Sequence, residues 1–91
     1  MSDEESHLID FYGTECVHCD EMSPLVEQLE TELNITVARK EVWHDEANQA
    51  EFEELAKDRC AGIPFFYNKK SGEWICGKAS YEKLKEWALS E

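Results

Sequence analysis

The sequence predicts an α/β fold with the element order β-α-β-α-β-β-α. An apolar run at residues 7–13 is followed by a helical pattern at 17–33, and a second strand pattern and helical pattern follow at 35–43 and 47–59. Two short strand patterns separated by turn residues then precede a last helix. A helical crossover makes the strands it joins parallel, whereas a tight turn makes them antiparallel. We therefore expect a four-stranded mixed sheet with helices on both faces.

Residues 7–13 predict a short central strand, because its apolar residues are nearly continuous, as in a strand covered on both faces. Asp10 interrupts this run. Residues 17–33 predict a helix with one apolar face, formed by Met22, Leu25, Val26, Leu29 and Leu33. Pro24 lies within this helix and is expected to bend it, and Asn34 is a suitable C-cap.

The second half of the chain predicts two strands joined by a hairpin. Residues 35–43 predict a strand whose charged end suits a sheet edge, and residues 47–59 predict the second helix. Gly62-Ile63-Pro64 opens a strand at 65–67, and residues 68–72 are rich in turn formers. Residues 73–76 predict the fourth strand, which Gly77 ends. Ser80 is then a suitable N-cap for the last helix.

Length and charge restrict the classes of partner. We interpret the 91 residues as one domain, 1–91, with a flexible N-terminus at 1–6. The net charge of −12 argues against nucleic acid and anionic membranes. No apolar run approaches the roughly 18 residues of a membrane span. The N-terminus has neither a basic segment nor an apolar run, so we expect a cytoplasmic monomer without a signal peptide.

Cys16-Val17-His18-Cys19 lies between the first strand and the first helix. A nucleophilic thiol must be ionised, and the free N–H groups and aligned dipoles of a helix N-terminus favour a thiolate. Cys19, one turn further on, can reach back to Cys16. The pattern therefore predicts a thiol–disulfide oxidoreductase, with no metal and no cofactor. The opposing interpretation is a structural or metal-binding cysteine pair.

Four motifs in this order resemble the thioredoxin family. They are Asp10-Phe11-Tyr12-Gly13 with Cys16 and Cys19, then Pro24, then Gly62-Ile63-Pro64, then Gly77. The resemblance covers His7 to Leu89 and implies a minimal thioredoxin fold, with strand order 2-1-3-4. The chain departs from the family by having Val17-His18 between the cysteines, Glu15 in place of a tryptophan, and Phe65 after the proline.

The resemblance also implies roles for individual residues. Cys16 is the exposed cysteine that attacks a substrate disulfide, Cys19 resolves the mixed disulfide, and the two form the redox-active disulfide. Asp10 is a buried general acid/base with a raised pKa that handles the proton of Cys19.

The substrate groove that the resemblance implies involves Ile63 and Pro64, which form a cis-proline loop, together with Gly77 and Tyr12. The backbone of Ile63 pairs with an extended substrate segment. The partners are then proteins with disulfides and, as electron donor, a reductase or glutathione.

Val17 and His18 are expected to tune the site. An imidazole near the thiolate stabilises it and makes the couple more oxidising, whereas Glu15, Asp20 and Glu21 have the opposite effect.

Cys60 and Cys76 lie outside the motif. We expect Cys60 at a helix end, packed as a small apolar residue, and Cys76 in a strand near the site. A second disulfide is the less favoured interpretation.

Two alternative functions remain open. One is a glutathione-dependent, glutaredoxin-like enzyme, for which Lys78 and Arg59 are the candidate cations. The other is a Cys/His metal-binding module.

Overall fold

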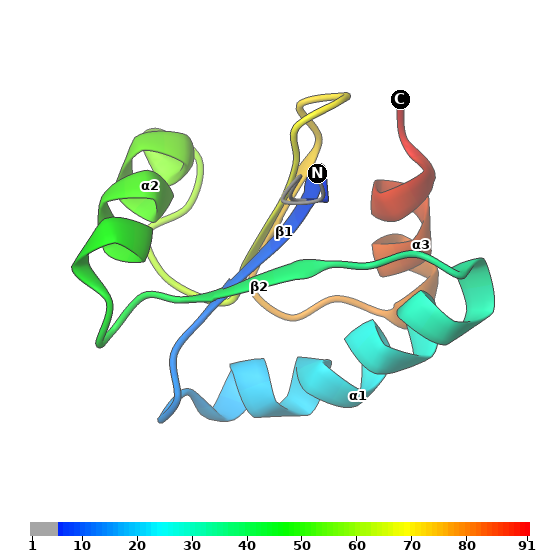
Figure 1. Ribbon diagram of the computed structural model, residues 1–91, viewed down its shortest axis with the longest axis horizontal. Helices are drawn as coiled ribbons and strands as arrows, with labels where there is room; N and C mark the ends of the chain where they lie inside the picture. Colours follow the sequence, from blue (N-terminus) through cyan, green and yellow to red (C-terminus); the bar gives the residue numbers. More distant parts are fainter. Residues whose placement is uncertain (1–5) are drawn as a thin grey trace.

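A four-stranded mixed sheet forms the centre of the computed structural model, which describes residues 6–91 (Figure 1). The elements are β1 (Leu8–Tyr12), α1 (Val17–Leu33), β2 (Ala38–Glu41), α2 (Glu46–Ala56), β3 (Phe65–Asn68), β4 (Trp74–Cys76) and α3 (Tyr81–Leu89). The strand order is β2-β1-β3-β4; β2 is parallel to β1, and the other pairs are antiparallel. The predicted element order and strand order are therefore confirmed. The expected flexible N-terminus, apart from Ser6, lies outside the described residues.

Alternate residues of β1 and β3 supply two cores. Leu8 and Phe66 pack with the apolar faces of α1 and α3, whereas Ile9, Phe11 and Phe65 pack with α2. Helices accordingly cover both faces of the sheet, with α2 on one side and α1 and α3 on the other (Figure 1). Side chains of a strand alternate between faces, so Asp10 lies on the α1 side, together with Leu8.

Two of the elements that are shorter than the sequence predicts, the second strand and the second helix, are shortened for identifiable reasons. The second strand begins at Ala38 rather than residue 35, because two backbone N–H groups before Ala38 donate to Glu30 of α1 and not to a neighbouring strand. The Ile35 N–H donates to the Glu30 carbonyl at 3.1 Å, and the Val37 N–H donates to the Glu30 carboxylate at 2.8 Å. The second helix ends at Ala56 because Lys57 leaves the helical conformation, and Asp58 then adopts a φ of 64°.

The predicted helix ends are otherwise well formed. Asn34 caps α1 in the left-handed conformation, and the Ser80 hydroxyl accepts the Lys83 N–H at 3.2 Å. Asp45 caps α2 in the same way, accepting the Asn48 N–H at 3.0 Å. These caps satisfy backbone groups that a helix cannot pair internally.

Asn68 is a buried polar residue that joins the hairpin to the last helix. Its amide nitrogen donates to the carbonyls of Trp87 and Ser90 at 2.9 and 3.0 Å. Its side-chain oxygen accepts the N–H groups of Lys70 and Ser71. One side chain therefore satisfies four backbone groups where β3 ends.

Replacing Asn68 by Ala should destabilise the protein by about 2–4 kcal/mol, because these backbone groups lose their partners. Urea unfolding measures the change. Ser71→Ala is the control, since it removes only an exposed bond to the Glu73 N–H and should stay within about 0.5 kcal/mol of the parent. Equal stability of the two variants would contradict the role assigned to Asn68.

Candidate active site

The Cys16 sulfur occupies the N-cap position of α1. Cys16 has extended backbone geometry, and its Sγ accepts a hydrogen bond from the Cys19 N–H at 3.1 Å. The two residues form a disulfide, with their Cα atoms 5.2 Å apart. The sulfur therefore lies where a helix offers free N–H donors and a positive dipole end. When the disulfide is reduced, the Cys19 N–H can donate to the Cys16 thiolate. A hydrogen bond to an ionised acceptor is stronger than one to a neutral acceptor.

The expectation that Cys16 is exposed was wrong for this disulfide form. Cys16 is 7% exposed and Cys19 is 4% exposed, so both residues are buried and differ little. Cys16 closes the turn that begins at Gly13, whose carbonyl accepts the Cys16 N–H at 3.1 Å. The N-cap position, rather than exposure, is therefore what distinguishes Cys16 from Cys19.

Two of the three carboxylates near the cysteines are paired with cations. The His44 ring lies 3.0 Å from Glu15, and hydrogen bonding between them lowers the pKa of Glu15 and raises that of His44. Glu21 bonds to the His18 ring at 3.1 Å and to Lys78 at 3.0 Å, which lowers its pKa in turn. These pairs reduce the negative potential that the sequence predicts around the thiol. His18 thus contacts Glu21, not the sulfur.

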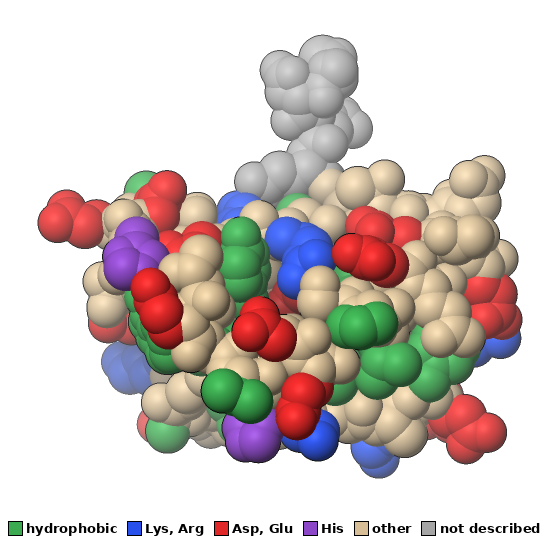
Figure 2. Space-filling model, turned by 90° about the horizontal axis from the view of Figure 1, so that it is seen from below, with side chains coloured by type: hydrophobic (Ala, Val, Ile, Leu, Met, Phe, Trp, Pro, Cys, Tyr) green, Lys and Arg blue, Asp and Glu red, His purple; other side chains and the backbone are tan. Residues whose placement is uncertain are grey.

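Acidic side chains are nevertheless spread over the face that carries α1, with small groups of hydrophobic side chains between them (Figure 2). Val17, between the two cysteines, is 67% exposed. It contributes an apolar side chain to the surface beside the disulfide.

Asp10 is buried in the centre of β1, at 2% exposure. Its Oδ2 lies 3.2 Å from the Arg39 guanidinium, whereas its Oδ1 has no hydrogen-bond partner among the described residues. Burial raises the pKa of Asp10 from 3.8 to about 6, and the nearby Arg39 opposes this increase. The negative charge of Glu30, on α1, raises the pKa further. A buried acid with a pKa near neutrality can exchange a proton under physiological conditions.

The segment before β3 lies beside the turn that carries Cys16. Phe65 pairs with Phe11 in the antiparallel register, so Ile63 falls next to Gly13. A Cβ on Gly13 would lie 2.8 Å from the Ile63 Cδ1 and 2.5 Å from the Trp43 ring, so only glycine fits between them. The Ile63–Pro64 peptide bond is cis. Pro64 is fully buried and Ile63 is half-buried.

Gly77 borders the same segment from the opposite side. Its N–H donates to the Pro64 carbonyl at 2.8 Å, and its φ is 89°, a conformation that favours glycine. Nothing lies within 4 Å of a Cβ built on Gly77, so space is open there. Tyr12 is half-buried, with the Arg39 guanidinium 5.2 Å from its ring centre. The fold therefore brings Ile63, Pro64 and Gly77 together, while Tyr12 lies with Arg39.

Cys60 and Cys76 form a second disulfide, contrary to the interpretation favoured from the sequence. Their Cα atoms are 5.5 Å apart. The presence of four cysteines in a short chain was a signal in the sequence that could have indicated a second disulfide. The partners could be chosen only once β4 was placed beside β3, with Cys76 opposite Phe65.

Three residues of the site were missed by the sequence reasoning. Arg39, interpreted only as an edge charge, is the partner of Asp10 because the two are paired in the β1–β2 register. Trp43 is half-exposed and covers Gly13. Glu41 accepts the backbone N–H groups of Thr14 and His44, which joins the two loops at this end of the sheet. None of these contacts has a local sequence signal.

Two features of residues 6–91 concern metal binding and membrane insertion. No group of three or more His, Cys, Asp or Glu side chains is arranged to hold a metal ion in this part of the chain. Within the same range, none of the helices has the length and apolar character to cross a membrane.

The comparisons with known proteins agree with this geometry. Among solved structures, a mutant of the thioredoxin-like protein BC3987 is similar, with a TM-score of 0.62 and 20% sequence identity. The match covers 93% of this chain and 97% of that one, and at this identity it shows the fold alone. No curated protein sequence matches significantly. The thioredoxin family model matches residues 1–90. Together with the helix-capping cysteine pair, this match supports a thiol–disulfide oxidoreductase in general, and the chain belongs to the thioredoxin family.

Proposed function

We propose that this protein catalyses reversible dithiol–disulfide exchange with protein substrates, with Cys16 as the attacking thiolate and Cys19 as the resolving thiol. The observation that carries the proposal is the hydrogen bond from the Cys19 N–H to the Cys16 sulfur at the N-cap of α1. This position lowers the pKa of a thiol, and the thiolate is the form that attacks.

The proposed reaction transfers two electrons. The Cys16 thiolate attacks one sulfur of the substrate disulfide, and the other substrate sulfur leaves as a thiolate. Cys19 then loses its proton and attacks Cys16, which closes the Cys16–Cys19 disulfide and releases the reduced substrate. A protein reductase or glutathione returns the two electrons.

Asp10 is the proposed acceptor of the Cys19 proton. It lies beneath α1 on the same side of the sheet as the cysteines, and its raised pKa suits proton transfer near neutral pH. Its Oδ1 has no partner among the described residues and is the atom available for this transfer, because Oδ2 is paired with Arg39.

The substrate would bind as an extended segment along Ile63, next to Val17 and the open space at Gly77. A segment in this position can pair with the Ile63 backbone, as in other cases of β-strand addition. Tyr12 would border this groove only through Arg39, which covers its ring.

The glutathione-dependent alternative has weaker support. Of its two candidate cations, Lys78 pairs with Glu21, and Arg59 donates to the Leu55 carbonyl and lies over Tyr67. Binding of the glutathione carboxylates would have to break these contacts. We therefore favour protein substrates.

Reduction of insulin disulfides tests the reaction, with thioredoxin reductase or glutathione as the electron donor in separate assays. Cys16→Ser should abolish turnover, because the attacking sulfur is lost. Cys19→Ser should accumulate a mixed disulfide with the substrate, visible as a mass increase under non-reducing conditions. If Cys16→Ser forms the mixed disulfide instead, the roles of the two cysteines are reversed.

Asp10→Asn should stabilise the fold and slow exchange near neutral pH. A shift from 3.8 to about 6, at 1.36 kcal/mol per unit, corresponds to about 3 kcal/mol. Because the folded pKa is raised, the protonated form is favoured on folding, so this stability is present below about pH 4 and is lost as pH rises through about 6. Chemical unfolding across this range should show the loss for the parent but not for the variant. An unchanged exchange rate would exclude the proton-transfer role.

His44→Ala should raise the pKa of the reduced Cys16 thiol, because Glu15 then loses its cationic partner and its negative charge acts on the neighbouring sulfur. The ultraviolet absorbance of the thiolate measures this pKa. Glu15→Gln should change it in the opposite direction, and His7→Ala, at the other end of β1, is the control. Identical titrations for all of these variants would show that the Glu15–His44 pair has no influence on the sulfur.

A further inference from the structure

The Cys60–Cys76 disulfide lies beside the proposed substrate groove. Cys60 follows α2, four residues before the cis Pro64, and Cys76 ends β4 directly before Gly77. Cys76 is opposite Phe65 in the sheet register, and the Gly77 N–H bonds to the Pro64 carbonyl. The disulfide and this hydrogen bond therefore hold the segment from Cys60 to Pro64 against the end of β4.

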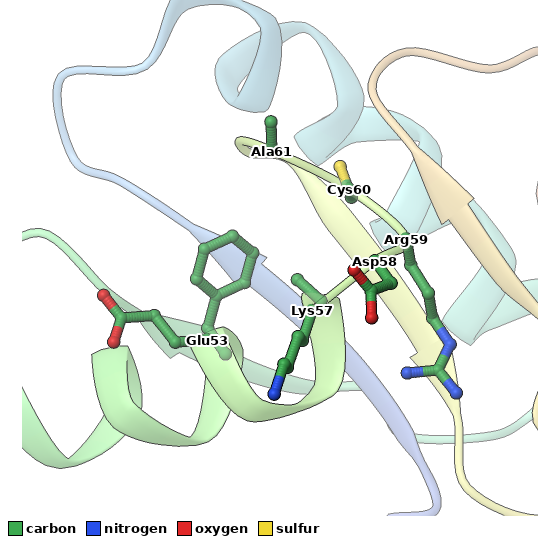
Figure 3. Close-up of a pocket in the computed structure, with 8 residues that line it drawn as sticks. Glu53, Lys57, Asp58, Arg59, Cys60 and Ala61 are labelled. Carbon is green, nitrogen blue, oxygen red and sulfur yellow. The ribbon is translucent and has the colours of Figure 1, made fainter.

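Packing holds the ends of this segment rather than its middle, because Cys60 and Ile63 pack against the core on the α2 side and Pro64 is buried. The loop after α2 borders an open hollow of about 490 Å³, lined by residues from Phe52 to Ala61 (Figure 3). Ala61 and Gly62 are exposed, and nothing lies within 4 Å of a Cβ built on Gly62. The disulfide therefore adds a covalent restraint at the start of a segment whose middle residues, Ala61 and Gly62, are exposed.

We propose that Cys60–Cys76 is a positioning disulfide, which stays closed while Cys16–Cys19 cycles and holds Ile63–Pro64 in place for the substrate. This inference rests on the proposed exchange activity. It assigns the second cysteine pair a role in substrate binding rather than in electron transfer.

The two disulfides differ in the helix ends that they face. Cys16 caps the N-terminus of α1, whereas the Cys60 N–H donates to the Ala56 carbonyl at 2.9 Å and so closes the C-terminal end of α2. A helix C-terminus carries partial negative charge, which disfavours a thiolate. Lys57 and Arg59 point their charged groups away from the Cys60 sulfur and do not offset this effect (Figure 3).

This difference determines which disulfide opens first. When a reductant thiolate attacks the Cys76 sulfur, the Cys76–Cys60 bond breaks and Cys60 must leave as a thiolate. A second reductant thiol then displaces the first from Cys76, so that two electrons enter the pair and the reductant becomes a disulfide. A poorly stabilised leaving thiolate makes this sequence unfavourable. Access is not the reason, because Cys76 is exposed whereas Cys16 is buried.

The first test titrates the wild-type protein with dithiothreitol buffers, followed by alkylation of free thiols and mass analysis of the peptides. We expect Cys16 and Cys19 to be alkylated first, and Cys60 and Cys76 only under more strongly reducing conditions. Alkylation of all four together, or of Cys60 and Cys76 first, would overturn the proposal. This test needs neither a variant nor catalytic activity.

The second test compares the wild type with the double variant Cys60→Ala/Cys76→Ala. For insulin, KM should rise about three- to tenfold, because the binding segment must be ordered on association, while kcat changes less than about twofold. The rate with the small disulfide DTNB, which needs no extended groove, should be unchanged. A fall in kcat for both substrates, or an unchanged KM for insulin, would contradict positioning.

Asn68→Ala is the matched control for lost stability, because Asn68 lies at the opposite end of β3 from Pro64. It should unfold more easily and keep its KM.

If the double variant does not fold, amide exchange of Gly77 in the wild type, measured before and after reduction of the Cys60–Cys76 disulfide, replaces it. Faster exchange after reduction supports the proposal, and equal exchange overturns it. If the wild-type protein reduces no disulfide substrate, the proposed function is refuted. The order of alkylation and the amide exchange of Gly77 would still test whether the Cys60–Cys76 disulfide restrains the segment.

Discussion

The hydrogen bond from the Cys19 N–H to the Cys16 sulfur is the interaction on which the site depends. It makes a reactive atom part of the helix cap, so the same N–H group that α1 leaves unpaired is available to a thiolate. A hydroxyl or carboxylate usually fills this position. Here the capping group is one that can also exchange electrons, and helix formation and thiol activation therefore share one contact.

Two of the three carboxylates nearest this sulfur are paired with other side chains. Glu15 is paired with His44, and Glu21 is paired with His18 and Lys78. The partners of these carboxylates come from the loop after β2, from α1 itself and from the loop after β4. A strongly negative protein can in this way reduce the opposing potential at a thiolate site, because Glu15 and Glu21 are each offset by a partner within a few ångströms.

The sheet register aligns the parts of the site that are distant in the sequence. Phe11 is paired with Phe65, and Phe65 is paired with Cys76. The end of β1, the start of β3 and the end of β4 therefore lie side by side at one end of the sheet. The turn to Cys16 follows β1, the cis Ile63–Pro64 bond immediately precedes β3, and Gly77 immediately follows β4. The second disulfide joins two of these segments, since Cys60 precedes the cis bond and Cys76 ends β4.

The sequence alone determined the element order, the helix caps at Asn34 and Ser80, and the cysteine pair at the start of a helix. These features depend on local periodicity and on contacts within a few residues, which a single chain segment specifies. Tertiary structure alone decided the burial of Cys16, the pairing of Asp10 with Arg39, the place of Trp43 over Gly13, and the Cys60–Cys76 bond. Each of these joins residues from different elements, so it depends on how strands are registered and helices are packed, which no local pattern specifies.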